Sequence, residues 1–106
     1  MATITPKVQA LMDDVRSYLN ITWRDPDTDN RVGIWISQGI AYLDGKRGCM
    51  VDYTKPSTSR TLLLEFCRYM RDSALDVFEN NYRSMILSMQ NEEAVARYVE
   101  KTVQEG

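Results

Sequence analysis

Three alternating aspartates form the part of this sequence best suited to binding a metal ion. They are Asp25, Asp27 and Asp29. Carboxylates alternate in the same way in a calcium-binding loop, but that loop also needs glycine at its sixth position and glutamate at its twelfth. Here those positions hold Asn30 and Ile36. Asp25 instead precedes Pro26, and a capping aspartate followed by proline is typical of a helix start. We therefore interpret the cluster as helix capping and predict no metal site.

Other reactive groups are few, because the chain contains no histidine. Without histidine there is no Ser-His or Cys-His nucleophile, no histidine metal ligand and no ordinary proton shuttle near neutral pH. Cys67 lies among apolar residues and is predicted to be a core thiol, and Cys49 has no activating neighbour. Paired carboxylates at catalytic spacing are not evident either. We expect a protein that is not an enzyme, with no catalytic residues and no cofactor.

Lys46 and Arg47 stand between two glycines, in a stretch that looks like a phosphate-binding turn. The stretch lacks the spacing and the Lys-Ser/Thr pair of a P-loop. It is either a solvated basic turn or a mobile basic loop tip that touches a partner or DNA. The second interpretation supports the alternative function, a small helical DNA-binding regulator. Against it, the formal net charge of -2 gives no general attraction to phosphates.

Composition fits one soluble globular domain. The chain has 106 residues, of which 43% are hydrophobic and 26% charged. No run of about 18 apolar residues occurs, so no membrane span is expected. The first ten residues lack the apolar core of a signal peptide, so we expect a cytosolic protein.

Helical periodicity runs through most of the sequence and predicts an all-α fold. Thr5 and Pro6 begin a first helix, and Pro26 begins a second that ends at Asp44-Gly45. Gly39 falls on the apolar face of the second helix, where a missing side chain lets a neighbouring helix approach closely. Ser57 or Ser59 would cap the third main helix.

The third main helix is predicted to run to about Met89, which is longer than a small core can cover. Its far end therefore overhangs and needs a partner. Asn91 then begins a short amphipathic C-terminal helix. The expected organisation is a helical domain over residues 1–90 and a tail helix over residues 91–106.

Apolar residues on this overhang, on the tail and off the main stripe of the second helix are the candidate subunit or partner contacts. Methionines there suit either a core or an adaptable contact surface. The candidates are Ile34, Tyr42, Tyr82, Met85, Met89, Tyr98 and Val99.

Three segments carry a resemblance to a known family. They read VRSYLNITWRDPDTDNRV, ISQGIAYLDGKRG and LLLEFCRYMRDSALDVFENNYRSMILSMQ. The N-I-T-W turn with its acidic continuation, the G-x-A-Y-L helix end and the run E-F-C-R-Y-x-R-x-x-A-L-x-x-F-E-x-N are its hallmarks. Over residues 15–89 the chain resembles the head–tail connector proteins of tailed phages and prophages, the adaptors that complete the head at the portal.

The resemblance implies a viral structural protein without enzymatic activity. Members of that family form an oligomeric ring beneath the portal protein, with its twelvefold symmetry, and receive the stopper or tail-completion protein. DNA would pass through the ring without specific binding. The implied location is the virion neck at the portal vertex, after assembly in the cytoplasm of the bacterial host.

Overall fold

The structure is a computed structural model that describes residues 6–23, 25–48 and 51–105, and its regular elements are all helices. The four helices are α1 (Pro6–Tyr18), α2 (Pro26–Arg47), α3 (Thr58–Arg71) and α4 (Leu75–Glu105). The described ranges contain no β-strand. The predicted all-α bundle of four helices is confirmed. None of these helices, as far as they are described, is long and apolar enough to cross a bilayer.

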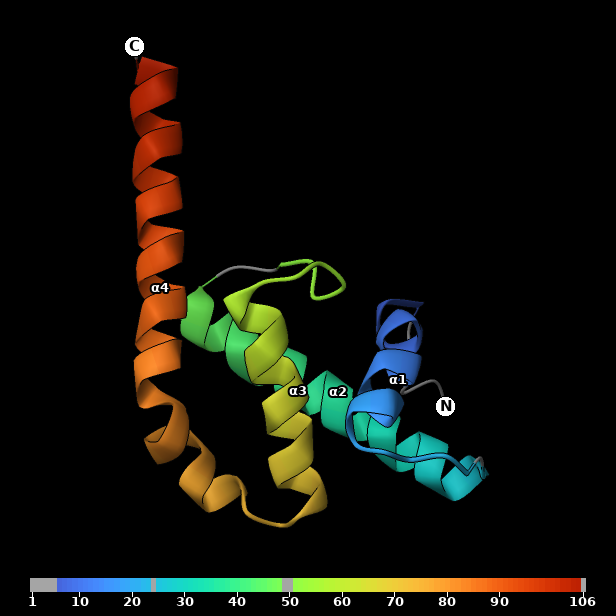
Figure 1. The fold of residues 1–106 in the computed structure, drawn as a ribbon. Coiled ribbons are helices and arrows are strands. Elements are labelled where there is room, and N and C mark those ends of the chain that lie inside the picture. The colour runs from blue at the N-terminus through green and yellow to red at the C-terminus, as the bar shows by residue number, and fades with distance from the viewer. Residues whose placement is uncertain (1–5, 24, 49–50, 106) are drawn as a thin grey trace.

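The central element is α2, which contacts each of the other three helices. Figure 1 shows α1 packed near the N-terminal end of α2 and α3 crossing its C-terminal half. Helix α4 turns back beside the C-terminal end of α2 and continues past it. The molecule measures 54 × 30 × 22 Å and is therefore elongated.

One continuous core joins the helices. Its fully buried side chains come from every helix and from the loop after α2, and include Val15, Ile36, Leu63, Phe78 and Met89. Aromatic rings of α2, α3 and α4 meet edge to face beside it: Phe66 and Phe78 have ring centroids 5.5 Å apart at 80°. Such edge-to-face pairs add specific attraction to the burial of apolar area.

Asp25 caps α2 as predicted. Its carboxylate accepts a hydrogen bond from the backbone N–H of Asp27 at 2.9 Å and from the Thr28 hydroxyl at 2.6 Å. These bonds, led by the one from Thr28, lower the pKa of the Asp25 carboxyl. Asp29 forms an ion pair with Arg16 of α1 at 2.8 Å. The acidic cluster therefore serves the start of a helix and its contact with α1.

The predicted end of α2 at Asp44-Gly45 is wrong. The helix includes Gly45 and ends at Arg47, where Gly48 adopts φ 88° and donates its N–H to the carbonyl of Asp44 at 2.8 Å. Glycine is favoured at such a left-handed position because it has no Cβ. Lys46 and Arg47 thus lie in the last helical turn and not in a loop.

The boundary between the third and fourth helices also differs from the prediction. The helix is interrupted at residues 72–74, because Ser73 adopts φ 55°. The Ser73 N–H donates to the carbonyl of Met70 at 3.2 Å, and the Ala74 N–H donates to the carbonyl of Tyr69 at 2.9 Å. These two bonds form a Schellman motif that ends α3. The break changes the phase of the helix that follows, and Val77 near its start is 42% exposed.

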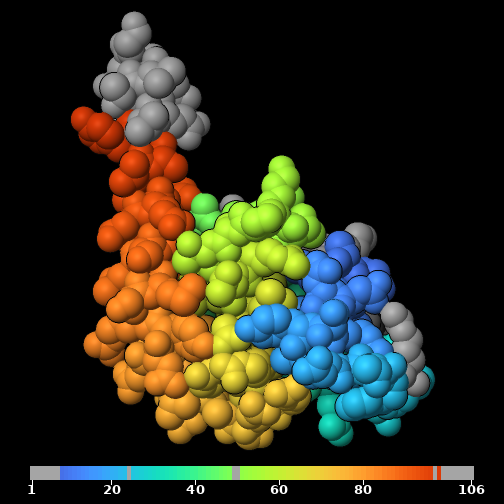
Figure 2. Space-filling model, viewed as in Figure 1, coloured from blue at the N-terminus to red at the C-terminus, as the bar shows by residue number. Residues whose placement is uncertain are grey.

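No break occurs at Asn91, where a separate tail helix was predicted. Residues 91–105 continue α4, whose 31 residues bend only at Tyr82 (φ -115°, ψ 17°). Met85 and Met89 of the predicted overhang pack in or against the core, and in Figure 2 only the orange-red part of α4 beyond them stands clear of the body.

Gly39 sets the closest approach of α3 to α2, as predicted. A Cβ at this position would lie 2.6 Å from Leu63 Cδ1 and 2.9 Å from Phe66 Cδ1. Both distances are too short for carbon atoms, so a side chain at Gly39 would require the Leu63 and Phe66 side chains to shift within a packed core.

Gly39→Ala should therefore destabilise the fold by about 1–3 kcal/mol, since overpacking outweighs the gain in helix propensity. Gly45→Ala in the same helix is the matched control, because nothing lies within 4 Å of its added Cβ. That variant should gain up to about 1 kcal/mol. Urea unfolding of both proteins checks the pair, and equal stabilisation by the two substitutions would contradict the packing described.

Candidate interaction surface

Four of the predicted contact residues are buried or partly buried against the molecule's own core. Met89 is 1% exposed and belongs to the core, and Met85 is half-buried against it. Tyr42 packs against the ring of Phe66 and donates its hydroxyl to Glu79 at 2.7 Å. Burial, assisted by this bond, raises the pKa of Tyr42 to about 12. These side chains, with Tyr82 below, pack in or against the core of the bundle, and Met89 is a core residue.

Tyr82 takes part in a buried polar junction centred on Glu65. Its hydroxyl and that of Tyr18 each donate to the Glu65 carboxylate, and Arg68 forms an ion pair with it at 2.5 Å. The Glu65 side chain is only 8% exposed. The junction joins α1, α3 and α4.

The electrostatics of this junction favour an ionised carboxylate. Burial alone would raise the pKa of Glu65, but the hydrogen bonds from Arg68, Tyr18 and Tyr82 outweigh it and lower the pKa. The pKa values of the three partners are raised in return. For Tyr18 and Arg68 the main cause is the hydrogen bond to Glu65. Burial is the main cause for Tyr82, whose pKa rises to about 12.

Lys46 and Arg47 are both engaged within the molecule. Lys46 forms an ion pair with Glu79 of α4 at 2.7 Å. Arg47 reaches Glu93 of α4 at 2.8 Å and donates to the buried hydroxyl of Ser59 in α3 at 2.8 Å. These contacts fasten the end of α2 to its neighbours, which does not fit a mobile basic loop tip.

The remaining candidates are Ile34, Tyr98 and Val99. Ile34 is half-buried, and Tyr98 is 72% exposed on the outer half of α4. The side chain of Val99 lies outside the described residues, as does Cys49. Cys67 is buried as predicted, and burial raises the pKa of its thiol to about 12.

Two further exposed apolar regions emerge. On α4, Leu87 and Val95 are 52% and 61% exposed and share one side of the helix with Tyr98, because their spacings of eight and eleven residues approximate two and three turns. We call these three residues the outer stripe. The second region is Trp23, 56% exposed between α1 and α2. Periodicity indicated Val95 and Tyr98, whereas nothing in the sequence marked Trp23 or Leu87 as exposed.

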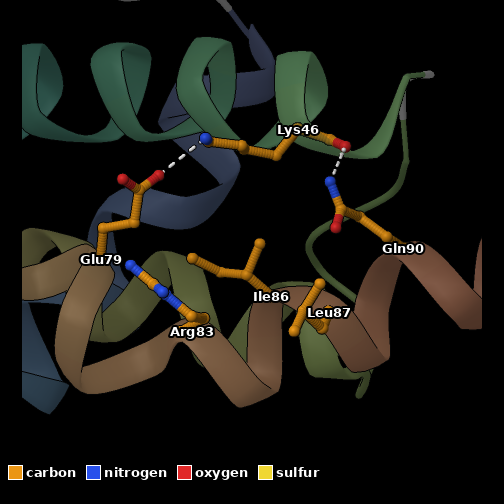
Figure 3. Close-up of a pocket in the computed structure, with 6 residues that line it drawn as sticks. All are labelled: Lys46, Glu79, Arg83, Ile86, Leu87 and Gln90. Carbon is orange, nitrogen blue, oxygen red and sulfur yellow. Dashed lines mark hydrogen bonds and ion pairs between the residues drawn. The ribbon is translucent and has the colours of Figure 1, made fainter.

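A groove lies between the last turn of α2 and the middle of α4, and Leu87 of the outer stripe is one of its lining residues. Its volume is about 260 Å³. Figure 3 shows Ile86 pointing toward α2, with the Lys46–Glu79 ion pair on one side and Gln90, which donates to the Lys46 carbonyl at 2.9 Å, on the other. Its lining residues are Lys46, Glu79, Arg83, Ile86, Leu87 and Gln90.

Comparisons with protein-family models, curated proteins and solved structures found no match to this chain. Within the described ranges, no three histidine, cysteine or carboxylate side chains gather as a metal-binding group would. The described surface presents an apolar stripe, an exposed indole and a small groove.

Glu65→Gln should lower the free energy of unfolding at neutral pH by about 1–3 kcal/mol, because two tyrosines and an arginine lose a charged acceptor. Since folding lowers the pKa of Glu65 below the ordinary 4.5, its contribution is complete above that pH and is lost as the pH falls through the folded-state value. The variant should therefore show a flatter loss of stability below pH 4.5. Denaturant unfolding across this range measures both effects.

Asp76→Asn is the control, since it removes an exposed carboxylate from the first turn of α4. It should keep the acid slope of the parent chain. Parallel stability curves for the parent and the Glu65 variant would show that the junction does not contribute as described.

Proposed function

We propose that this chain is a non-enzymatic structural protein of a tailed phage or prophage. It would assemble as a ring adaptor between the portal protein and the stopper or tail-completion protein during head completion. The proposal is supported by the resemblance over residues 15–89 together with an elongated helical body whose apolar surfaces lie at separate places.

The outer half of α4 is the observation that favours an assembly protein most. It extends past the other helices in Figure 1 and carries Val95 and Tyr98, which are 61% and 72% exposed. Contiguous exposed apolar residues of this kind mark interaction surfaces in soluble proteins. In a ring, each further contact forms within an assembly already held together, so individually weak interfaces sum to a stable one.

Charge is consistent with DNA passing through such a ring without specific binding. The formal net charge is -2, and the two adjacent cations of α2 are paired with Glu79 and Glu93. Affinity for DNA comes mainly from cations that neutralise phosphates, and here those two cations are already neutralised. The alternative of a DNA-binding regulator therefore loses its main support, and we assign the protein to the portal vertex of the virion.

Replacing Val95 and Tyr98 together by serine should abolish docking on the portal while leaving the helix content unchanged, since both side chains are largely exposed. Ala96→Ser is the matched control, because it adds one hydroxyl to an exposed position on the opposite side of the same helix. Electron microscopy of purified portal mixed with each protein gives the result. A normal ring on the portal from the double variant would remove α4 from the proposal.

A further inference from the structure

Trp23 is exposed on a rigid support. Its carbonyl accepts a hydrogen bond from Arg16, which is itself 5% exposed and paired with Asp29 at 2.8 Å. Its indole N–H lies 3.3 Å from the Thr28 hydroxyl, which in turn donates to Asp25. The ring is therefore held in place while 56% of the residue faces solvent. A preorganised tryptophan loses little conformational entropy on binding and is a frequent centre of interface energy.

The groove at the other end of α2 has the size and lining for one such side chain. Its volume of about 260 Å³ is below the roughly 300–1,000 Å³ of most small-molecule sites, whereas a cavity of about 150 Å³ already admits a benzene ring. Ile86 and Leu87 supply apolar contacts, and Arg83 lies on the rim (Figure 3).

Charges match between the two regions. Asp27 follows Trp23 by four residues and is exposed, with no ion pair among the described residues. Arg83 precedes Leu87 by four residues and is exposed, with a long hydrogen bond to Asn80 at 3.4 Å. Its charge also helps to lower the pKa of Glu79 in the same groove. If the Trp23 indole packed on Leu87 with the Asp27 carboxylate toward Arg83, the two opposite charges would pair.

The indole and the groove cannot meet within one chain. They lie at opposite ends of α2, whose 22 residues span about 33 Å (Figure 1). The occupant of the groove must then come from another molecule, and a second copy supplies a complementary one. Contact between two different surfaces of identical chains is heterologous, and it produces a ring when the rotation between copies closes.

We infer that Trp23 of one copy inserts into the groove between α2 and α4 of the next copy, with Asp27 facing Arg83 across the contact. The inference rests on the ring proposed above and specifies its repeating interface. It uses Leu87 of the outer stripe and leaves Val95 and Tyr98 for the portal or the next neck component.

Fluorescence of Trp23 tests the contact directly. The chain has two tryptophans, so Trp35→Phe leaves Trp23 as the sole reporter. Its emission should shift to shorter wavelength as the protein concentration rises and again when the protein assembles on its portal. Leu87→Glu in this background should weaken self-association by roughly thirtyfold or more, the loss typical of a central contact. Ser88→Ala, one position along at an exposed site, should leave it unchanged.

Two mixing experiments establish the head-to-tail arrangement. Trp23→Ala keeps an intact groove and Leu87→Glu keeps an intact indole, so each alone should stay monomeric and an equal mixture should form dimers only. Asp27→Arg and Arg83→Asp should each weaken assembly, and the two together in one chain should restore it.

The outcomes separate this inference from the proposed function. A chain that docks on the portal with unchanged Trp23 emission would overturn the contact and leave the function standing. Emission that shifts with concentration in a chain that ignores the portal would support the contact and contradict the function. Unchanged emission under both conditions, or higher oligomers from the mixture of the two single variants, would also overturn the contact.

Discussion

The buried carboxylate of Glu65 is the constraint on which the course of α4 depends. It receives hydrogen bonds from Tyr18 of α1 and Tyr82 of α4, and it pairs with Arg68 of its own helix. A charge with 8% of its side chain exposed must be fully hydrogen-bonded, since an unpaired buried charge would cost several kcal/mol. The junction therefore admits few alternative positions for α4, and its bend occurs at Tyr82 itself.

From that bend, α4 runs along the end of α2 and then beyond it. Glu93 is the last of its residues with an ion pair to the body in the described structure, through Arg47. Farther along, Val95 and Tyr98 are largely exposed, because α4 there has extended past α2 and α3. One helix thus contributes to the core in its first half and presents apolar side chains to a partner in its second. These two roles, one in the core and one at the surface, account for the length of this 31-residue helix.

Local signals in the sequence sufficed for the all-α class, the Asp25 cap and the close approach at Gly39, because each depends on residue type and period alone. The break after α3 escaped prediction because Ser73 takes a left-handed conformation that usually belongs to glycine. The burial of Glu65 could not be predicted from its own helix, because two of its three partners, Tyr18 and Tyr82, come from other helices. The candidate contacts were mispredicted for a similar reason. Tyrosine and methionine, as at Tyr42 and Met89, occur both in cores and in interfaces, and only tertiary packing distinguishes a core residue from an interface residue.

Hydrogen–deuterium exchange of α4 tests the central claim most directly, namely that its outer half is a binding surface awaiting a partner. In the free protein, backbone amides of residues 91–98 should exchange much faster than those of residues 78–89, which lie against the core. In assembled necks bearing the portal, residues 91–98 should become as protected as residues 78–89. Equal exchange of residues 91–98 in free and assembled protein would contradict the account.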